Sequence, residues 1–151
     1  MTDPVISKIE GQCLCGSVQI TVRDMKPLIN VCHCAMCRKW GGGPFFTMQG
    51  ASHDITGEEH VTTFKSSDWA ERASCGKCGS NLYYRFLPTG HTNFLAGLFD
   101  LPESVTIKQQ VFVDEKPPYY DFAQATPMKT GADVIAEAAS QLSAAGISFG
   151  D

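Results

Sequence analysis

The residues best suited to chemistry in this chain are its cysteines. Seven cysteines fall into three tight groups: Cys13-x-Cys15, Cys32-x-Cys34-x-x-Cys37 and Cys75-x-x-Cys78. An odd number argues against a fully paired disulfide framework. Thiols two or three residues apart are poor disulfide partners in a reducing compartment, but they suit the coordination of a tetrahedral metal ion. The spacing therefore predicts metal ligands, and zinc as the metal.

Two of the groups suit one closed site. Cys13 and Cys15 would point to the same face of an extended strand, because side chains two residues apart share a face. Cys75 and Cys78 have the outline of a zinc knuckle, and the glycines beside them permit a tight turn. Four thiolates around one ion are typical of structural zinc. We expect this metal to tie an N-terminal hairpin to the middle of the chain.

The third group has one ligand fewer. Cys32 and Cys34 would share a strand face, and Cys34 and Cys37 would share a helix face, so three sulfurs can converge. A zinc ion with three protein ligands keeps an open position, which is typical of a catalytic site. His33 could fill that position, but it lies between two ligands and should face away from them. The alternative is a set of reactive or reversibly oxidised thiols without metal.

Short strands dominate the rest of the chain. Alternation of apolar and polar residues, interrupted by Gly, Pro, Asn and Asp, predicts strands over residues 5–13, 16–22, 28–32, 45–49, 61–65, 81–86, 93–98 and 108–113. Many short strands with frequent turns favour a mainly β fold, either a sandwich or an open barrel.

Two helices complete the predicted elements. A short helix should follow the Cys32 group and run from about Cys34 to about Trp40, since the glycines at 41–43 can end it in a left-handed conformation. A second helix should span roughly 132–145 within a C-terminal segment 131–146. Thr130 is its candidate N-cap, with Asp133 three residues later.

Length and composition limit the possible classes. The chain has 151 residues, of which 43% are hydrophobic, and a formal charge of −4. It should form one domain over residues 1–151. The negative charge disfavours binding to nucleic acid or to an anionic membrane. No apolar run is long enough for a membrane span, and the N-terminus lacks the pattern of a secretion signal, so we expect a cytoplasmic protein.

Three stretches carry a family resemblance: Gly11-Gln12-Cys13-Leu14-Cys15-Gly16-Ser17-Val18, Cys32-His33-Cys34-Ala35-Met36-Cys37-Arg38-Lys39-Trp40-Gly41-Gly42, and Cys75-Gly76-Lys77-Cys78-Gly79-Ser80. They closely resemble the glutathione-dependent formaldehyde-activating enzyme family, also called the centromere-protein-V/GFA family. The segments at 66–72, 82–85, 96–98 and 113–117 look like the bacterial branch. The resemblance covers nearly the whole chain.

The resemblance implies a fold and a cofactor content. The fold would be Mss-four-like, a tent of short twisted β-sheets pinned by zinc. Two zinc ions per chain are implied, one structural and one catalytic, with all seven family cysteines present. The structural ligands would be Cys13, Cys15, Cys75 and Cys78, and the catalytic ligands would be Cys32, Cys34 and Cys37.

The resemblance also implies an activity, the condensation of glutathione with formaldehyde to S-(hydroxymethyl)glutathione and its reversal. Zinc held by three thiolates suits thiol activation better than Lewis-acid activation of the aldehyde, because the thiolates already donate charge to the metal. The candidate thiol-binding residues are Arg38, Lys39, Trp40, Gly42, Phe46 and Arg72. The cations would hold carboxylates, the aromatic side chains would line a pocket, and the glycine would admit a close approach.

Two other functions fit the same residues. A non-catalytic, zinc-stabilised binding module could share the fold, although the acidic composition disfavours a chromatin partner. A thiol redox enzyme could use the Cys32 group, but no cysteine lies outside the three groups to act separately. The oligomeric state and the true electrophile stay open at this point.

Overall fold

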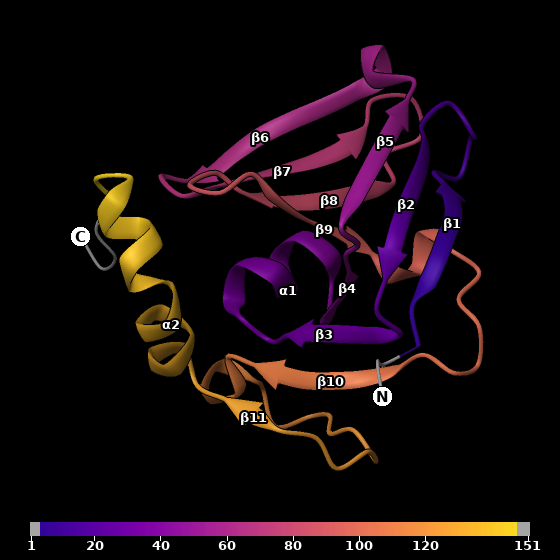
Figure 1. Cartoon of the computed structure of the whole chain (residues 1–151). Coiled ribbons are helices and arrows are strands. Elements are labelled where there is room, and N and C mark those ends of the chain that lie inside the picture. The colour runs from indigo at the N-terminus through magenta and orange to yellow at the C-terminus, as the bar shows by residue number, and fades with distance from the viewer. Residues whose placement is uncertain (1–3, 148–151) are drawn as a thin grey trace.

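The computed structural model describes residues 4–147. Within this range the chain folds into two β-sheets with two α-helices and three short 3-10 turns (Figure 1). The strands are β1 (Ile6–Gln12), β2 (Gln19–Met25), β3 (Leu28–Cys32), β4 (Phe45–Met48), β5 (Ser52–Thr56), β6 (Val61–Ser67), β7 (Ala70–Cys75), β8 (Asn81–Phe86), β9 (His91–Leu95), β10 (Thr106–Val111) and β11 (Met128–Lys129). The prediction of a mainly β fold is confirmed.

The strands divide unequally between the two sheets. The small sheet has the order β1-β2-β5, and the large sheet has the order β11-β10-β3-β4-β9-β8-β7-β6. Neighbours pair antiparallel except at β10, which runs parallel to both β3 and β11. The large sheet bends around α1 (Ala35–Gly41), with β3 and β10 on one side and β6, β7 and β8 on the other (Figure 1).

The core is made by strand faces that follow the predicted alternation. In β2 the side chains of Ile20, Val22 and Met25 are buried while the residues between them are not. They pack in one cluster with Leu82 of β8 and Phe94 of β9. The cluster therefore joins the small sheet to the large one, and it supports the strands that carry the cysteines.

Both predicted helices are present with the predicted ends. The short helix α1 has Cys34 as its N-cap, and Gly42 ends it with φ +86°, a conformation that glycine adopts readily. The second helix, α2 (Gly131–Ala144), begins with a full capping box between Thr130 and Asp133. In Figure 1 it stands apart from α1, beyond the end of β11.

Several strand predictions need correction. β5, β7 and β11 were not predicted, and β7 shows why: its sequence Ala-Glu-Arg-Ala-Ser-Cys has low intrinsic strand preference, and pairing with β6 and β8 overrides it. The strands predicted over 93–98 and 108–113 end earlier than expected. Each gives way to a 3-10 turn, at Ala96–Leu98 and Val113–Glu115.

Among the described residues, neither helix combines the length and the apolar character that a bilayer crossing requires.

Candidate functional site

The first cysteine group joins the two sheets. Cys13 and Cys15 lie in the turn between β1 and β2, whereas Cys75 ends β7 and Cys78 lies in the turn to β8. Sulfur atoms of this set lie within 4.8 Å of one another. The turns close because Cys13 N–H donates to the Val18 carbonyl, and Gly79 N–H donates to the Cys75 carbonyl.

The sulfur spacing fits a tetrahedral metal ion. Cys13 Sγ lies 3.6 Å from Cys15 Sγ, and Cys15 Sγ lies 3.8 Å from Cys75 Sγ. Four sulfurs at about 2.3 Å from a zinc ion would be separated by about 3.8 Å. The four residues therefore fit zinc in number, in donor type and in separation.

Ser80 connects the two halves of this site. Its hydroxyl accepts a hydrogen bond from Leu14 N–H at 3.0 Å and lies 3.2 Å from Cys78 Sγ. The hydrogen bond with Ser80 lowers the pKa of Cys78 to about 5. A thiol that ionises so readily is a suitable metal ligand at neutral pH.

The second group lies where β3 meets α1. Cys32 ends β3, Cys34 caps α1 and Cys37 lies one turn into the helix, with the three sulfurs within 4.8 Å of one another. Cys34 Sγ also accepts a hydrogen bond from Cys37 N–H at 3.3 Å. The three sulfurs converge as the spacing predicted, and they could supply three of the four ligands of a tetrahedral metal ion.

The three thiols cannot all ionise unaided. Hydrogen bonds with Cys32 and then Cys37 lower the pKa of Cys34. The pKa of Cys32 is raised, first by its hydrogen bonds with Cys34 and Cys37 and then by burial. For Cys37 the hydrogen bond with Cys32 acts downward, but the bond with Cys34 and burial outweigh it, so the pKa is raised. One thiolate with two donors is the expected metal-free state. A divalent cation would stabilise all three thiolates.

Arg72 of β7 brings a buried positive charge to this group. Its guanidinium nitrogens Nη1 and Nη2 lie 3.8 and 3.7 Å from Cys37 Sγ, and its Nε donates to Ser66 Oγ. The guanidinium lies over the rings of Trp40, at 5.0 Å, and Tyr84, at 5.2 Å. Only 6% of Arg72 is exposed. The cation therefore faces the sulfur cluster within a largely aromatic frame.

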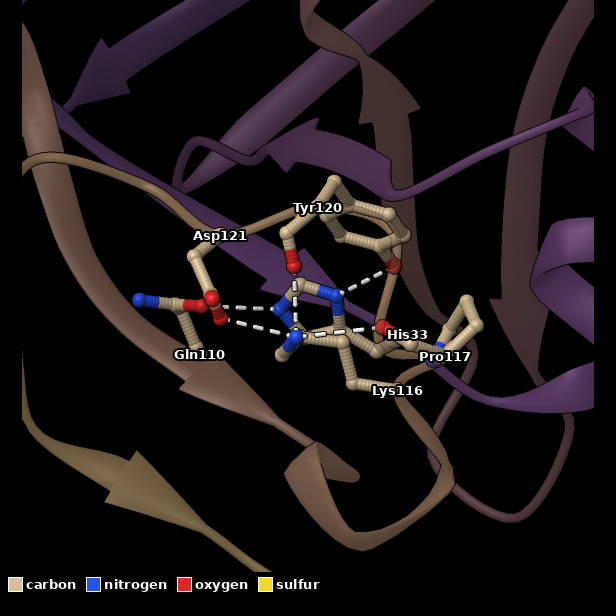
Figure 2. A network of polar contacts seen from close by, with 6 residues as sticks. All are labelled: His33, Gln110, Lys116, Pro117, Tyr120 and Asp121. Carbon is tan, nitrogen blue, oxygen red and sulfur yellow. Dashed lines mark hydrogen bonds and ion pairs between the residues drawn. The ribbon is translucent and has the colours of Figure 1, made fainter.

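His33 faces away from the sulfurs, as expected, and is fully buried behind them. Figure 2 shows its ring held between two side chains: Nε2 donates to Gln110 Oε1 at 2.9 Å, and Nδ1 accepts from Tyr120 at 2.7 Å. Burial lowers the pKa of His33, so the ring is neutral. Lys116 ties the same segment through the Tyr120 carbonyl and Asp121. This network fixes the backbone that carries Cys32 and Cys34.

A cavity of about 720 Å³ opens beside the second group. Its floor includes Cys32, Cys34, Cys37 and Arg72, and α2 contributes part of its wall. The volume lies within the range of small-molecule binding sites. Polar side chains also line it, and the buried Oδ1 of Asn30 has no hydrogen-bond partner in the described part of the chain.

The residues expected to bind the thiol are distributed unevenly around this cavity. Arg72 lines it. Arg38, Lys39, Trp40, Gly42 and Phe46 do not contribute to its lining within the described residues. Their positions explain this. Arg38 Nε donates to the His33 carbonyl, and Lys39 is exposed. The ring of Trp40 packs against Phe45, and Gly42 caps α1. Phe46 stacks on Phe122.

Some parts of the site were not predicted from the sequence. Tyr84, Gln110 and Tyr120 contact site residues from strands and loops that are distant in sequence. The sequence predicted α2 as a helix, but nothing in its spacing indicated that Val134, Ile135 and Ala138 would line a cavity. Local motifs identified the cysteine groups, whereas these contacts depend on how the large sheet closes around α1.

Comparison with known proteins agrees with the geometry. A family model described as "Glutathione-dependent formaldehyde-activating enzyme" matches residues 8–115, which include all seven cysteines. An uncharacterised lyase of Schizosaccharomyces pombe is 36% identical over 128 residues, covering 83% of this chain and 93% of that protein. A putative glutathione-dependent formaldehyde-activating enzyme of Halomonas elongata is 32% identical over 85 residues, covering 50% of this chain and 54% of that protein.

One solved structure is also similar. A crystal structure of a Rhodobacter sphaeroides protein aligns with a TM-score of 0.49 and 21% sequence identity, covering 61% of this chain and 88% of that chain.

Proposed function

The chain belongs to the glutathione-dependent formaldehyde-activating enzyme family, and on that premise we propose that it is a zinc-dependent carbon–sulfur lyase acting on a thiol–aldehyde adduct. The reaction resembles that of S-(hydroxymethyl)glutathione synthase. In the direction of cleavage the carbon–sulfur bond breaks, a carbonyl forms, and the hydroxyl proton of the adduct ends on the sulfur. No oxidant or reductant is needed.

The observation that carries this proposal is a sulfur cluster one ligand short of a tetrahedron, at the floor of a cavity. We assign Cys32, Cys34 and Cys37 as the ligands of a catalytic zinc, and Cys13, Cys15, Cys75 and Cys78 as the ligands of a structural one. Zinc at the three-cysteine site would supply an open position at which a thiol is held as a thiolate at neutral pH.

Arg72 would offset the charge that builds up at the cluster. Three thiolates and one zinc ion carry a net charge of −1, and an incoming thiolate makes it −2. The Arg72 guanidinium lies 3.7 Å from Cys37 Sγ, and only 6% of Arg72 is exposed, so its positive charge would stabilise this negative charge strongly. Burial raises the pKa of Tyr84, so this neighbouring ring stays neutral and adds no competing negative charge.

The chain's other residues would orient the cluster and the thiol. Gln110 and Tyr120 hold His33 and so keep Cys32 and Cys34 turned toward the cavity. Asn30 would present its unpaired Oδ1 to an amide or ammonium donor of the thiol, as glutathione offers. We propose glutathione as the thiol and the cytoplasm as the location, since thiols are kept reduced there.

The experiment that tests this proposal uses thiol binding. Protein with cobalt in place of zinc should gain thiolate-to-metal absorption when glutathione is added, because a fourth sulfur joins the metal. Calorimetry in buffers of different ionisation heat should show about one proton released per glutathione. S-methylglutathione, which cannot form a thiolate, should give neither signal.

The Cys32→Ser variant serves as the control, since it removes a ligand of the catalytic set and leaves the structural set whole. It should lose the glutathione-dependent absorption. The proposal is wrong if glutathione and S-methylglutathione bind equally well with no proton release, which would indicate a binding module beside an inert metal. Formation of a disulfide within the Cys32 group, with no second metal bound, would instead favour the thiol redox enzyme.

A further inference from the structure

Part of the cavity wall comes from α2 and is largely apolar. Val134, Ile135 and Ala138 all line the cavity, and their spacing places them on one face of the helix. The opposite face carries exposed residues, among them Ala136 and Ser140. The apolar stripe is thus directed at the cavity.

The helix is held in this position at both ends. At its start Gly131 N–H donates to Asp114 Oδ1 at 2.8 Å, and any Cβ at Gly131 would approach the ring of Phe112 to 2.8 Å. Near its end Leu142 is 2% exposed. Lys129 pairs with Glu137 at 2.7 Å on the outer side. The wall is therefore a defined surface rather than a loosely attached segment.

Aromatic side chains add to the apolar lining of the cavity. Trp69, Phe86 and Phe112 line the same cavity. The cations in the lining are Arg72, which is directed at Cys37, and the exposed Lys108. Formaldehyde would add a single carbon to a thiol, too little to cover this surface. The lining matches an adduct with a larger apolar group.

The position of α2 in the chain makes the wall a feature of this protein's own C-terminal segment. The family model matches residues 8–115, and α2 begins at Gly131. The ligand-bearing part of the site lies inside the matched range, whereas the apolar wall lies outside it. The cysteines and the α2 part of the lining thus come from different segments, whereas Trp69, Phe86 and Phe112 lie within the matched range.

We propose that the substrate is a hemithioacetal whose carbonyl-derived carbon carries an apolar chain or ring, the adduct of a thiol with an aldehyde larger than formaldehyde. This rests on the proposed lyase function. Cleavage breaks the carbon–sulfur bond, turns the carbinol into the aldehyde carbonyl and leaves the hydroxyl proton on the thiol. The apolar substituent lies against Val134, Ile135 and Ala138.

Exchange between free and adducted aldehyde, followed by NMR, tests the turnover side. The enzyme should have a kcat/KM at least about tenfold higher for the glutathione adduct of hexanal than for that of formaldehyde, because several methylenes are buried. Ala138→Asp places a charge in the wall and should lower this ratio. Ala136→Asp makes the same change on the outer face and should leave the ratio unaltered.

Calorimetry tests the binding side without catalysis. S-hexylglutathione should bind the wild type and Ala136→Asp at least about tenfold more tightly than S-methylglutathione, and this advantage should shrink in Ala138→Asp. Accelerated exchange without any preference for the larger group would refute the role of the apolar wall in substrate binding and leave the lyase function supported. A hexyl preference without accelerated exchange would sustain the wall and reject the lyase. Equal behaviour of the two Asp variants would also overturn the inference.

Discussion

Replacing Arg72 by methionine should weaken the binding of a substrate thiolate at the three-cysteine site without disturbing the four-cysteine site. Methionine retains most of the length of the arginine side chain and removes its charge. The guanidinium nitrogens lie 3.7 and 3.8 Å from Cys37 Sγ, so the variant removes the nearest described cation from the cluster. Trp40 and Tyr84 would then pack on a thioether, which aromatic rings accept well.

The size of the effect follows from the distance. Opposite unit charges about 4 Å apart interact by about 4 kcal/mol at an effective dielectric constant of about 20. Part of this gain is offset in the wild type, because a guanidinium that is 6% exposed has lost most of its hydration. The zinc-filled cluster gains one negative charge when a thiolate binds, so a net loss of about 2 kcal/mol corresponds to about 30-fold weaker glutathione binding.

Calorimetric titration of the zinc-loaded protein with glutathione measures this affinity, with metal content per chain recorded for each variant. Arg85→Met is the matched control: Arg85 is half-buried on the neighbouring strand, paired with Glu71 at 3.2 Å and lying over the ring of Tyr83. It should leave the glutathione affinity unchanged. The reasoning fails if Arg72→Met binds glutathione as tightly as the wild type does, or if Arg85→Met weakens that binding equally.

Two further predictions concern the fold. Cys75→Ser should leave the four-cysteine site incomplete and cost several kcal/mol of stability, seen as insoluble protein or a large fall in Tm, whereas Cys32→Ser should stay folded; a Cys75→Ser protein that keeps its zinc and its Tm would contradict the structural assignment. Burial beside Phe94 lowers the pKa of His53 below its usual 6.5, so the unfolded chain takes up the proton first as the pH falls. The stability present above pH 6.5 is thus lost on acidification, and His53→Gln should show a smaller fall in Tm between pH 7.5 and 5.5; an equal fall in both proteins would exclude His53 as a cause.

The convergence of the cysteine sulfurs could be predicted from the sequence because it depends on local geometry. Two residues along a strand, or three along a helix, determine which sulfurs can meet, and Cys32, Cys34 and Cys37 need no other part of the chain for this. The capping residues of α2 were equally readable, since Thr130 and Asp133 lie three residues apart. The pairing of Cys13 and Cys15 with the knuckle rested on ligand count, and the structure brings them together.

Contacts across the large sheet were not readable in this way. Arg72 was expected to hold a carboxylate, and its approach to Cys37 depends on β7 lying opposite α1 across the curved sheet. Gln110 reaches His33 because β10 runs parallel to β3, a pairing between segments 77 residues apart. β7 itself was missed because its glutamate and arginine have low strand preference, and two neighbouring strands impose the conformation.

The two cysteine groups differ in the length of chain that must be synthesised before all members of the group are present. Cys32, Cys34 and Cys37 leave the ribosome almost together, so a metal can engage them at once. Cys15 must wait for Cys75, 60 residues later, and closing a loop of that length costs about 4 kcal/mol of chain entropy. A metal at the four-cysteine site would thus be captured only when both sheets have formed. Arrival of that ion and completion of the fold become one event, and the rate of maturation depends on the free zinc that the nascent chain meets.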